Sequence, residues 1–188
     1  MKVLLLIFIN FLTFISMAQT ENQKYIVTNK INDIEIREYL PAIYASVTLE
    51  ENSAKQNSLF RILANYIFGG NDENQKIAMT APVHMQKENA GEKDAFTMKF
   101  VMPSEYNLND LSKPNDPRVN IYKSNQKKYA AIGYGGYNSD SKSDDHYKKL
   151  KTILKNNNIK YSGNPIYLGY DPPYKFWGRK NEILLELE

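Results

Sequence analysis

The sequence contains no cysteine and only two histidines, and these absences remove whole classes of site. Without cysteine there is no disulfide framework, no thiolate nucleophile and no Cys-based zinc site. His84 and His146 lie 62 positions apart, which excludes a metal motif of the HExxH type.

The chain also lacks a strong excess of charge of one sign. Its 24 Lys and Arg residues oppose 21 Asp and Glu residues, and no long basic block occurs, so we expect no nucleic-acid partner. A length of 188 residues with 42% hydrophobic residues is typical of one globular domain with a real core. The 14 tyrosines favour an aromatic-rich β protein.

A short apolar run opens the chain. Lys2 is followed by 13 mostly apolar residues, 3–15, and then by Ser16 and Ala18, small residues at the spacing of a cleavage site. The run is shorter than the roughly 20 residues that a membrane-spanning helix needs. We therefore predict a signal peptide over 1–18, a mature domain over 19–188 with no integral membrane segment, and a periplasmic or secreted location. The absence of cysteine excludes attachment as a bacterial lipoprotein.

The first half of the mature chain reads as strands around one helix. Residues 25–49 alternate between apolar and polar types, as strands do. Asn52 and Ser53 then predict a helix start, and Gly69 with Gly70 predicts its end. Two strands over 76–86 and 95–102 follow, joined by a polar loop over 87–94. The helix has one apolar face, made of Leu59, Phe60, Leu63, Tyr66 and Ile67.

The second half repeats this order. Residues 119–123 and 129–134 read as strands, a helix opens at Ser143 and ends at 156–158, and strands follow over 166–170 and 182–187. We therefore predict an α+β fold: a distorted barrel of two pseudo-repeated ββαββ halves, one mixed or antiparallel sheet with two flanking helices. The stretch 103–117 connects the halves.

Common catalytic motifs are missing. The glycines at 133, 135 and 136 lack the GxGxxG spacing, no P-loop occurs, and no GxSxG elbow accompanies either histidine. We therefore expect no enzyme.

One stretch does carry possible metal ligands. Residues 76–85 contain Met79, His84 and Met85, and thioether and imidazole groups are the types that hold haem iron. Alternation places Met79 and Met85 on one face of a strand and His84 on the other. The same pattern also allows the two methionines to fill the core while His84 faces solvent.

Several separated blocks resemble the SOUL/haem-binding protein family. The helix and strand blocks cover residues 60–69 and 76–83, and the crossover blocks cover 100–106 and 114–119. The C-terminal blocks are Tyr170-Asp-Pro-Pro and Arg179-Lys-Asn-Glu. Any one block is weak, but all of them in this order are specific and span nearly the whole mature chain.

This resemblance implies the same barrel and a tetrapyrrole ligand held on an open hydrophobic surface by the first helix. We thus expect an exported, non-catalytic, monomeric protein that binds haem or a related porphyrin. Candidate contacts for the macrocycle are Phe60, Leu63 and Phe68, and candidate partners for its carboxylates are Arg61, Arg179 and Lys180. If iron is ligated, we expect weak coordination by His84, Met85 or a tyrosine rather than by His146.

Two other functions stay open. The same fold could serve as a module that binds a protein or another hydrophobic ligand, without haem. A small-molecule hydrolase would need a paired acid and base in a pocket, and the sequence shows no such pair.

Overall fold

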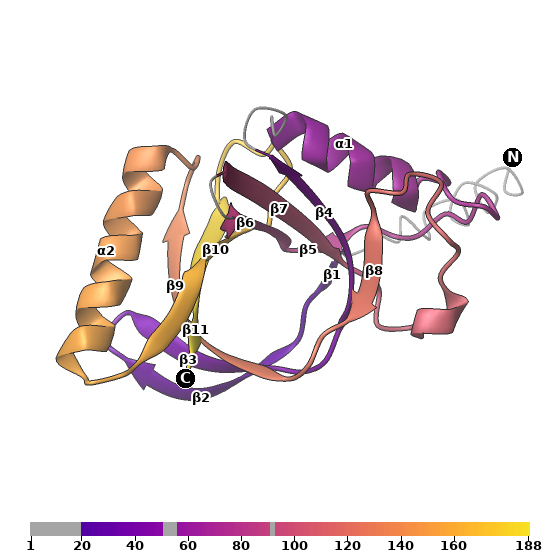
Figure 1. Ribbon diagram of the computed structural model, residues 1–188. Coiled ribbons are helices and arrows are strands. Elements are labelled where there is room, and N and C mark those ends of the chain that lie inside the picture. The colour runs from indigo at the N-terminus through magenta and orange to yellow at the C-terminus, as the bar shows by residue number, and fades with distance from the viewer. Residues whose placement is uncertain (1–19, 51–55, 91–92) are drawn as a thin grey trace, which may run out of the picture.

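The computed structural model describes residues 20–50, 56–90 and 93–188 (Figure 1). Within these residues nine strands form one sheet in which all neighbours are antiparallel. They are β2 (Tyr25–Ile31), β3 (Ile34–Tyr39), β4 (Ile43–Glu50), β6 (Val83–Ala90), β7 (Lys93–Val101), β8 (Asn120–Lys123), β9 (Lys127–Gly135), β10 (Tyr161–Gly169) and β11 (Lys180–Leu187). A short parallel pair, β1 (Glu21–Asn22) and β5 (Thr80–Ala81), lies apart from this sheet.

The strand order interleaves the two halves of the chain. It runs β2-β3-β9-β11-β10-β6-β7-β4-β8, so β10 of the second half meets β6 of the first half at the centre. The first half places β3 beside β9, and the second half places β8 beside β4. The antiparallel sheet with two helices confirms the predicted fold class.

The sheet curls into a distorted barrel without closing by hydrogen bonds (Figure 1). The edge strands are β2 and β8. Short connections at 40–42 and 124–126 carry the chain from β3 to β4 and from β8 to β9, and so bridge from one end of the sheet to the other.

Both helices pack on the outer face of the curved sheet. Helix α1 (Gln56–Ile67) lies over β4 and β7, and α2 (Asp140–Asn156) lies over β9 and β11 (Figure 1). Leu59 and Leu63 of α1 and Leu150 and Leu154 of α2 are buried against these strands. The central strands β6 and β10 therefore lie between the two helices. A 3-10 turn, η1 (Leu108–Asp110), lies in the crossover.

Some predicted boundaries were wrong. Helix α2 starts at Asp140 rather than Ser143, because Ser139 caps it and accepts a hydrogen bond from the Lys142 amide. The predicted polar loop 87–94 is mostly strand, since β6 and β7 pair along their full length. Residues 77–79 belong to no strand.

The predicted signal peptide and the predicted start of the first helix at Asn52 and Ser53 lie outside the described residues. Among the helices that the structure does describe, none has the length and apolar character needed to cross a membrane.

Candidate functional site

Two rows of side chains cross the outer face of the sheet between the helices. Partners directly opposite each other on antiparallel strands point to the same face, so the strand register fixes each row. One row is Phe100, Val83, Gly169 and Asn181, and the next is Met98, Met85, Tyr167 and Ile183. Phe100 and Met98 are buried under α1, and Ile183 is buried under α2.

The middle of both rows remains accessible. Val83, Met85 and Tyr167 are half-buried, and Gly169 is exposed. We call these four residues of β6 and β10 the inter-helix surface. A Cβ atom added at Gly169 would meet nothing within 4 Å, so the space above this strand end is open. A strand glycine with open space above it lets a flat ligand approach the backbone closely.

Aromatic side chains border this surface. Phe60 of α1 is 37% exposed, and its ring centroid lies 5.4 Å from that of Phe100. Tyr147 of α2 packs partly buried on the α2 side. Burial raises the pKa of the Tyr167 hydroxyl, and the nearby negative charge of Asp144 raises it further.

A loop rich in aromatic residues follows the end of β10. This aromatic loop, residues 170–179, exposes the side chains of Tyr174, Phe176 and Trp177 by 74%, 72% and 80%. It begins directly after Gly169 and so starts at the edge of the inter-helix surface. Large apolar groups exposed together in this way usually mark a binding surface.

Arg179 holds the aromatic loop in shape. Its Nη1 donates to the carbonyl oxygens of Pro172 at 2.6 Å and Lys175 at 3.0 Å, and its Nη2 donates to that of Asp171 at 3.2 Å. The guanidinium also lies 4.6 Å from the ring centroid of Tyr137. The predicted carboxylate partner Arg179 is therefore engaged with the loop backbone.

The structure separates the other predicted contacts. Arg61 is exposed on α1, next in sequence to Phe60. The side chain of Leu63, on the buried face of α1, has no exposed area and packs in the core between the helix and the sheet. Phe68 is 65% exposed but follows the last residue of α1, about 12 Å along the helix from Phe60. Lys180 points toward the barrel interior, where it pairs with Glu182 at 3.1 Å.

His84 lies inside the barrel, on the opposite face from Met85. It is 5% exposed, its Nε2 lies 2.8 Å from Oε1 of Gln23, and its ring meets that of Tyr44 edge-on. Burial, together with the positive charge of Lys99, lowers the pKa of His84 to about 3. The imidazole is thus neutral and faces away from the inter-helix surface, so the alternative in which His84 faces solvent was wrong.

The other candidate iron ligands, the thioether of Met79 and the imidazole of His146, lie on different elements. Met79 is 38% exposed and precedes β5. His146 stacks on Tyr134 at 4.5 Å between centroids, and its Nδ1 lies 2.8 Å from the Lys142 carbonyl oxygen. In the part of the chain that the structure describes, no three His, Asp or Glu residues are grouped to hold a metal ion.

Acid should destabilise the protein through His84. The unfolded imidazole takes up a proton near pH 6.5, whereas the folded one stays neutral down to about pH 3, so protons bind preferentially to the unfolded chain between these values. We expect the free energy of unfolding to fall by about 1 kcal/mol per pH unit through this group as the pH drops below 6.5. Urea unfolding at pH 7, 6 and 5 should show a steeper loss for the native chain than for His84→Gln. Equal slopes would contradict this assignment, and His146→Gln is the control.

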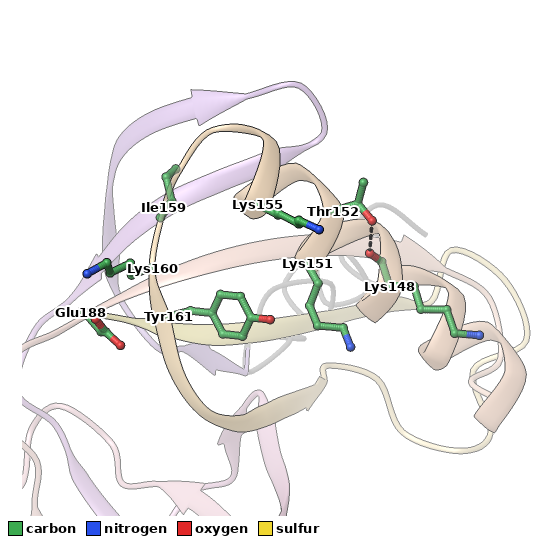
Figure 2. A pocket seen from close by; sticks show the side chains of 8 residues that line it. All are labelled: Lys148, Lys151, Thr152, Lys155, Ile159, Lys160, Tyr161 and Glu188. Carbon is green, nitrogen blue, oxygen red and sulfur yellow. Dashed lines mark hydrogen bonds between the residues drawn. The ribbon is translucent and has the colours of Figure 1, made fainter.

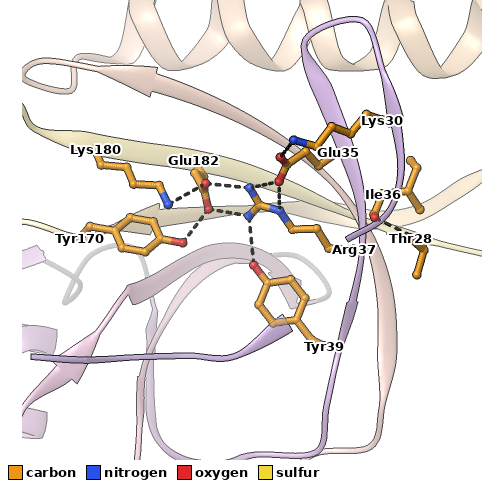
Figure 3. A network of polar contacts seen from close by, with 9 residues as sticks. All are labelled: Thr28, Lys30, Glu35, Ile36, Arg37, Tyr39, Tyr170, Lys180 and Glu182. Atoms are coloured by element: carbon orange, nitrogen blue, oxygen red, sulfur yellow. Dashed lines mark hydrogen bonds and ion pairs between the residues drawn. The ribbon is translucent and has the colours of Figure 1, made fainter. Parts of the chain in front are cut away.

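A buried ion-pair network crosses the barrel interior (Figure 3). Arg37 is 5% exposed and donates to both carboxylate oxygens of Glu182, at 2.8 and 2.9 Å. The Tyr170 hydroxyl donates to Glu182 at 2.6 Å, and Glu35 accepts from Arg37 Nε at 2.9 Å. Burial alone would raise the pKa of Glu182, but the hydrogen bonds from Arg37 and Tyr170 outweigh it and lower that pKa. The network joins β3, β11 and the end of β10, which makes it a structural cross-link.

Sequence reasoning missed Val83, Tyr167 and Gly169. These residues meet only through the pairing of β6 with β10, which joins segments about 80 positions apart. The aromatic loop did carry a signal, because Tyr174, Phe176 and Trp177 cluster in a Pro- and Gly-containing stretch with no strand alternation.

The sequence also matches a known protein family. The family model described as SOUL heme-binding protein matches residues 20–186. The chain belongs to this family. This SOUL chain is 30% identical over 158 residues to "Heme-binding protein 2" of Homo sapiens, covering 80% of this chain and 76% of that protein. It is 26% identical over 155 residues to "Heme-binding protein 1" of Xenopus tropicalis, covering 79% and 80%.

Solved structures share the fold of this SOUL chain at low identity. The EcmrR C-terminal domain superposes with a TM-score of 0.60 at 12% identity, covering 82% of this chain and 96% of that one. A hydrolase from Listeria innocua gives a TM-score of 0.60 at 10% identity, covering 90% and 100%. At such identities the likeness shows the fold alone.

Proposed function

We propose that this chain binds haem or a related tetrapyrrole, without catalysis, on the inter-helix surface. The observation that carries the proposal is the open strip between the helices, where half-buried Val83, Met85 and Tyr167 lie beside the bare backbone of Gly169. The family and the relatives named as heme-binding proteins support the same ligand.

The residues at this surface fit a flat, apolar macrocycle. Phe60 and the aromatic loop add aromatic area at its borders. Covering about 300 Å² of apolar surface would contribute roughly 7 kcal/mol as an upper value, a contribution that does not depend on a metal bond. The ligand's carboxylates need cations, and exposed Arg61 on α1 is the predicted contact best placed for them.

The iron of bound haem would offer a site for an axial ligand. Met85 lies on the inter-helix surface, partly buried against the core under α1, whereas His84 is hydrogen-bonded to Gln23 on the other face. We therefore propose that Met85, rather than His84 or His146, is the protein group nearest the iron, and that its contribution to affinity is small.

A haem titration tests the proposal. Saturation at one equivalent with a shifted Soret band is expected for the native chain. Met85→Ala should alter the spectrum while largely keeping the affinity, and His146→Ala should change neither. Binding that never saturates would contradict the proposal, as would loss of the spectrum in His146→Ala alone.

A second function has one observation in its favour. The three exposed aromatic side chains of the aromatic loop also suit a protein partner or another hydrophobic ligand. Absence of saturable haem binding by a folded chain would favour this alternative.

We also propose export of the protein, from the charged start, the apolar run and the Ser16-x-Ala18 site. Protein recovered from the cell envelope or medium should have an intact mass that begins at Gln19. The unprocessed mass in the cytoplasm would contradict export.

A further inference from the structure

A basic pocket lies at the C-terminal half of α2, separate from the inter-helix surface (Figure 2). Its volume is about 570 Å³. Lys148, Lys151 and Lys155 of α2 line it, and Lys160 joins them from the connection to β10. The spacings of three and four residues place the first three lysines on one face of the helix.

These four lysines differ from their neighbours in lacking carboxylate partners. Among the described residues, no Asp or Glu forms an ion pair with any of them. Lys149, on the same helix but directed elsewhere, pairs with Asp33. Glu188 lines the pocket without pairing with a lysine.

Other polar groups complete the pocket. The Tyr161 side chain points in among the lysines, and its hydroxyl has no hydrogen-bond partner in the described part of the chain (Figure 2). The Thr152 hydroxyl instead donates to the Lys148 carbonyl oxygen at 2.9 Å. Lys151 lies 4.2 Å from the Tyr147 ring centroid, which limits the directions its ammonium group takes. Four lysines, one glutamate and one tyrosine hydroxyl without a hydrogen bond to the described residues therefore line an open volume, with an excess of positive charge.

We infer that this pocket binds an anion carrying several linked or clustered phosphate groups. The repulsion among lysines that outnumber the single nearby glutamate is relieved by a bound polyanion, and ammonium groups suit phosphate as point charges. Two or three linked phosphates carry more negative charge and reach further than one orthophosphate, which suits lysines spread over about two turns of the helix. The free polyphosphate and the phospholipid headgroup share this chemistry.

Calorimetric titration with inorganic tripolyphosphate at low ionic strength tests the inference. We expect saturable binding near one equivalent, stronger than that of orthophosphate and weakened by added salt. The double variant Lys151→Glu/Lys155→Glu should bind at least tenfold more weakly. The control Lys123→Glu/Lys128→Glu makes the same change in net charge at exposed positions outside the pocket and should bind as the native chain does.

The outcomes separate this site from the haem proposal and identify its source of phosphate. Lack of saturable tripolyphosphate binding, or equal weakening of that binding in the two double variants, would overturn the inference. The affinity for haem is expected to stay unchanged in both double variants. Co-sedimentation with phosphatidic acid vesicles that Lys151→Glu/Lys155→Glu abolishes would assign the lipid headgroup. Tripolyphosphate binding without co-sedimentation would assign a free polyphosphate.

Discussion

Replacing Glu182 with glutamine is expected to lower the free energy of unfolding by about 3 kcal/mol, because it removes the buried counter-charge of Arg37 and leaves the guanidinium only the more exposed Glu35. Both side chains are almost fully buried, with 6% and 3% of the Arg37 and Glu182 side chains exposed. The variant also weakens the acceptor of the Tyr170 hydroxyl and so disturbs the junction of β3, β10 and β11 (Figure 3). Urea unfolding at pH 7 measures the loss, provided that the m-value stays constant.

An exposed ion pair that also involves β11, the strand of Glu182, supplies the control. Lys127 of β9 pairs with Glu186 of β11 at 2.7 Å, but their side chains are 43% and 36% exposed. Exposed pairs of this kind contribute at most about 1 kcal/mol, so Lys127→Gln should have little effect. A loss below about 1 kcal/mol for Glu182→Gln would show that the buried network does not hold the barrel together.

Substituting phenylalanine for Gly169 is expected to weaken haem binding about a hundredfold. The new side chain would enter the open space above the inter-helix surface, where a Cβ meets no atom within 4 Å. Displacing about 100 Å² of apolar contact removes roughly 2.5 kcal/mol of binding free energy. The fold should tolerate the change, because Gly169 lies at a strand end and its φ is not in the left-handed region. The Soret titration measures the affinity, and urea unfolding checks the stability.

Ser162→Phe is the matched control for this substitution. Ser162 lies on the same strand, exposed and paired with Glu186, near the other end of β10. It should bind haem with native affinity. If both variants bind as the native chain does, the ligand does not lie over Gly169.

Much of the architecture could be predicted from the sequence. The alternation of residues 25–49 and the apolar face of α1 indicate strands and an amphipathic helix from local pattern alone. Strand ends were harder to predict, because Lys87 and Glu88 are polar and yet continue β6 through their pairing with β7. Likewise, Ser139 starts α2 as a cap before any apolar periodicity begins.

The candidate site was less predictable because it depends on strand register. Alternation correctly separated Met85 from His84, but it could not show which face is covered by helices and which faces the barrel interior. The face of His84 turned out to be the interior, closed by Gln23 and Tyr44. The basic pair Arg179 and Lys180 likewise splits between the aromatic loop and the interior network, since Arg179 ends the loop whereas Lys180 is the first residue of β11.

The most direct test of the inter-helix surface is an NMR spectrum of the methionine methyl groups with iron-free protoporphyrin IX at one equivalent. The porphyrin ring current acts only at short range, so the methyl group of Met85 should shift strongly, and Met85→Leu identifies its signal. Met102, which is 4% exposed in the core under α1, should stay in place. A bound porphyrin that leaves the Met85 signal unmoved would contradict the location of the ligand between the helices.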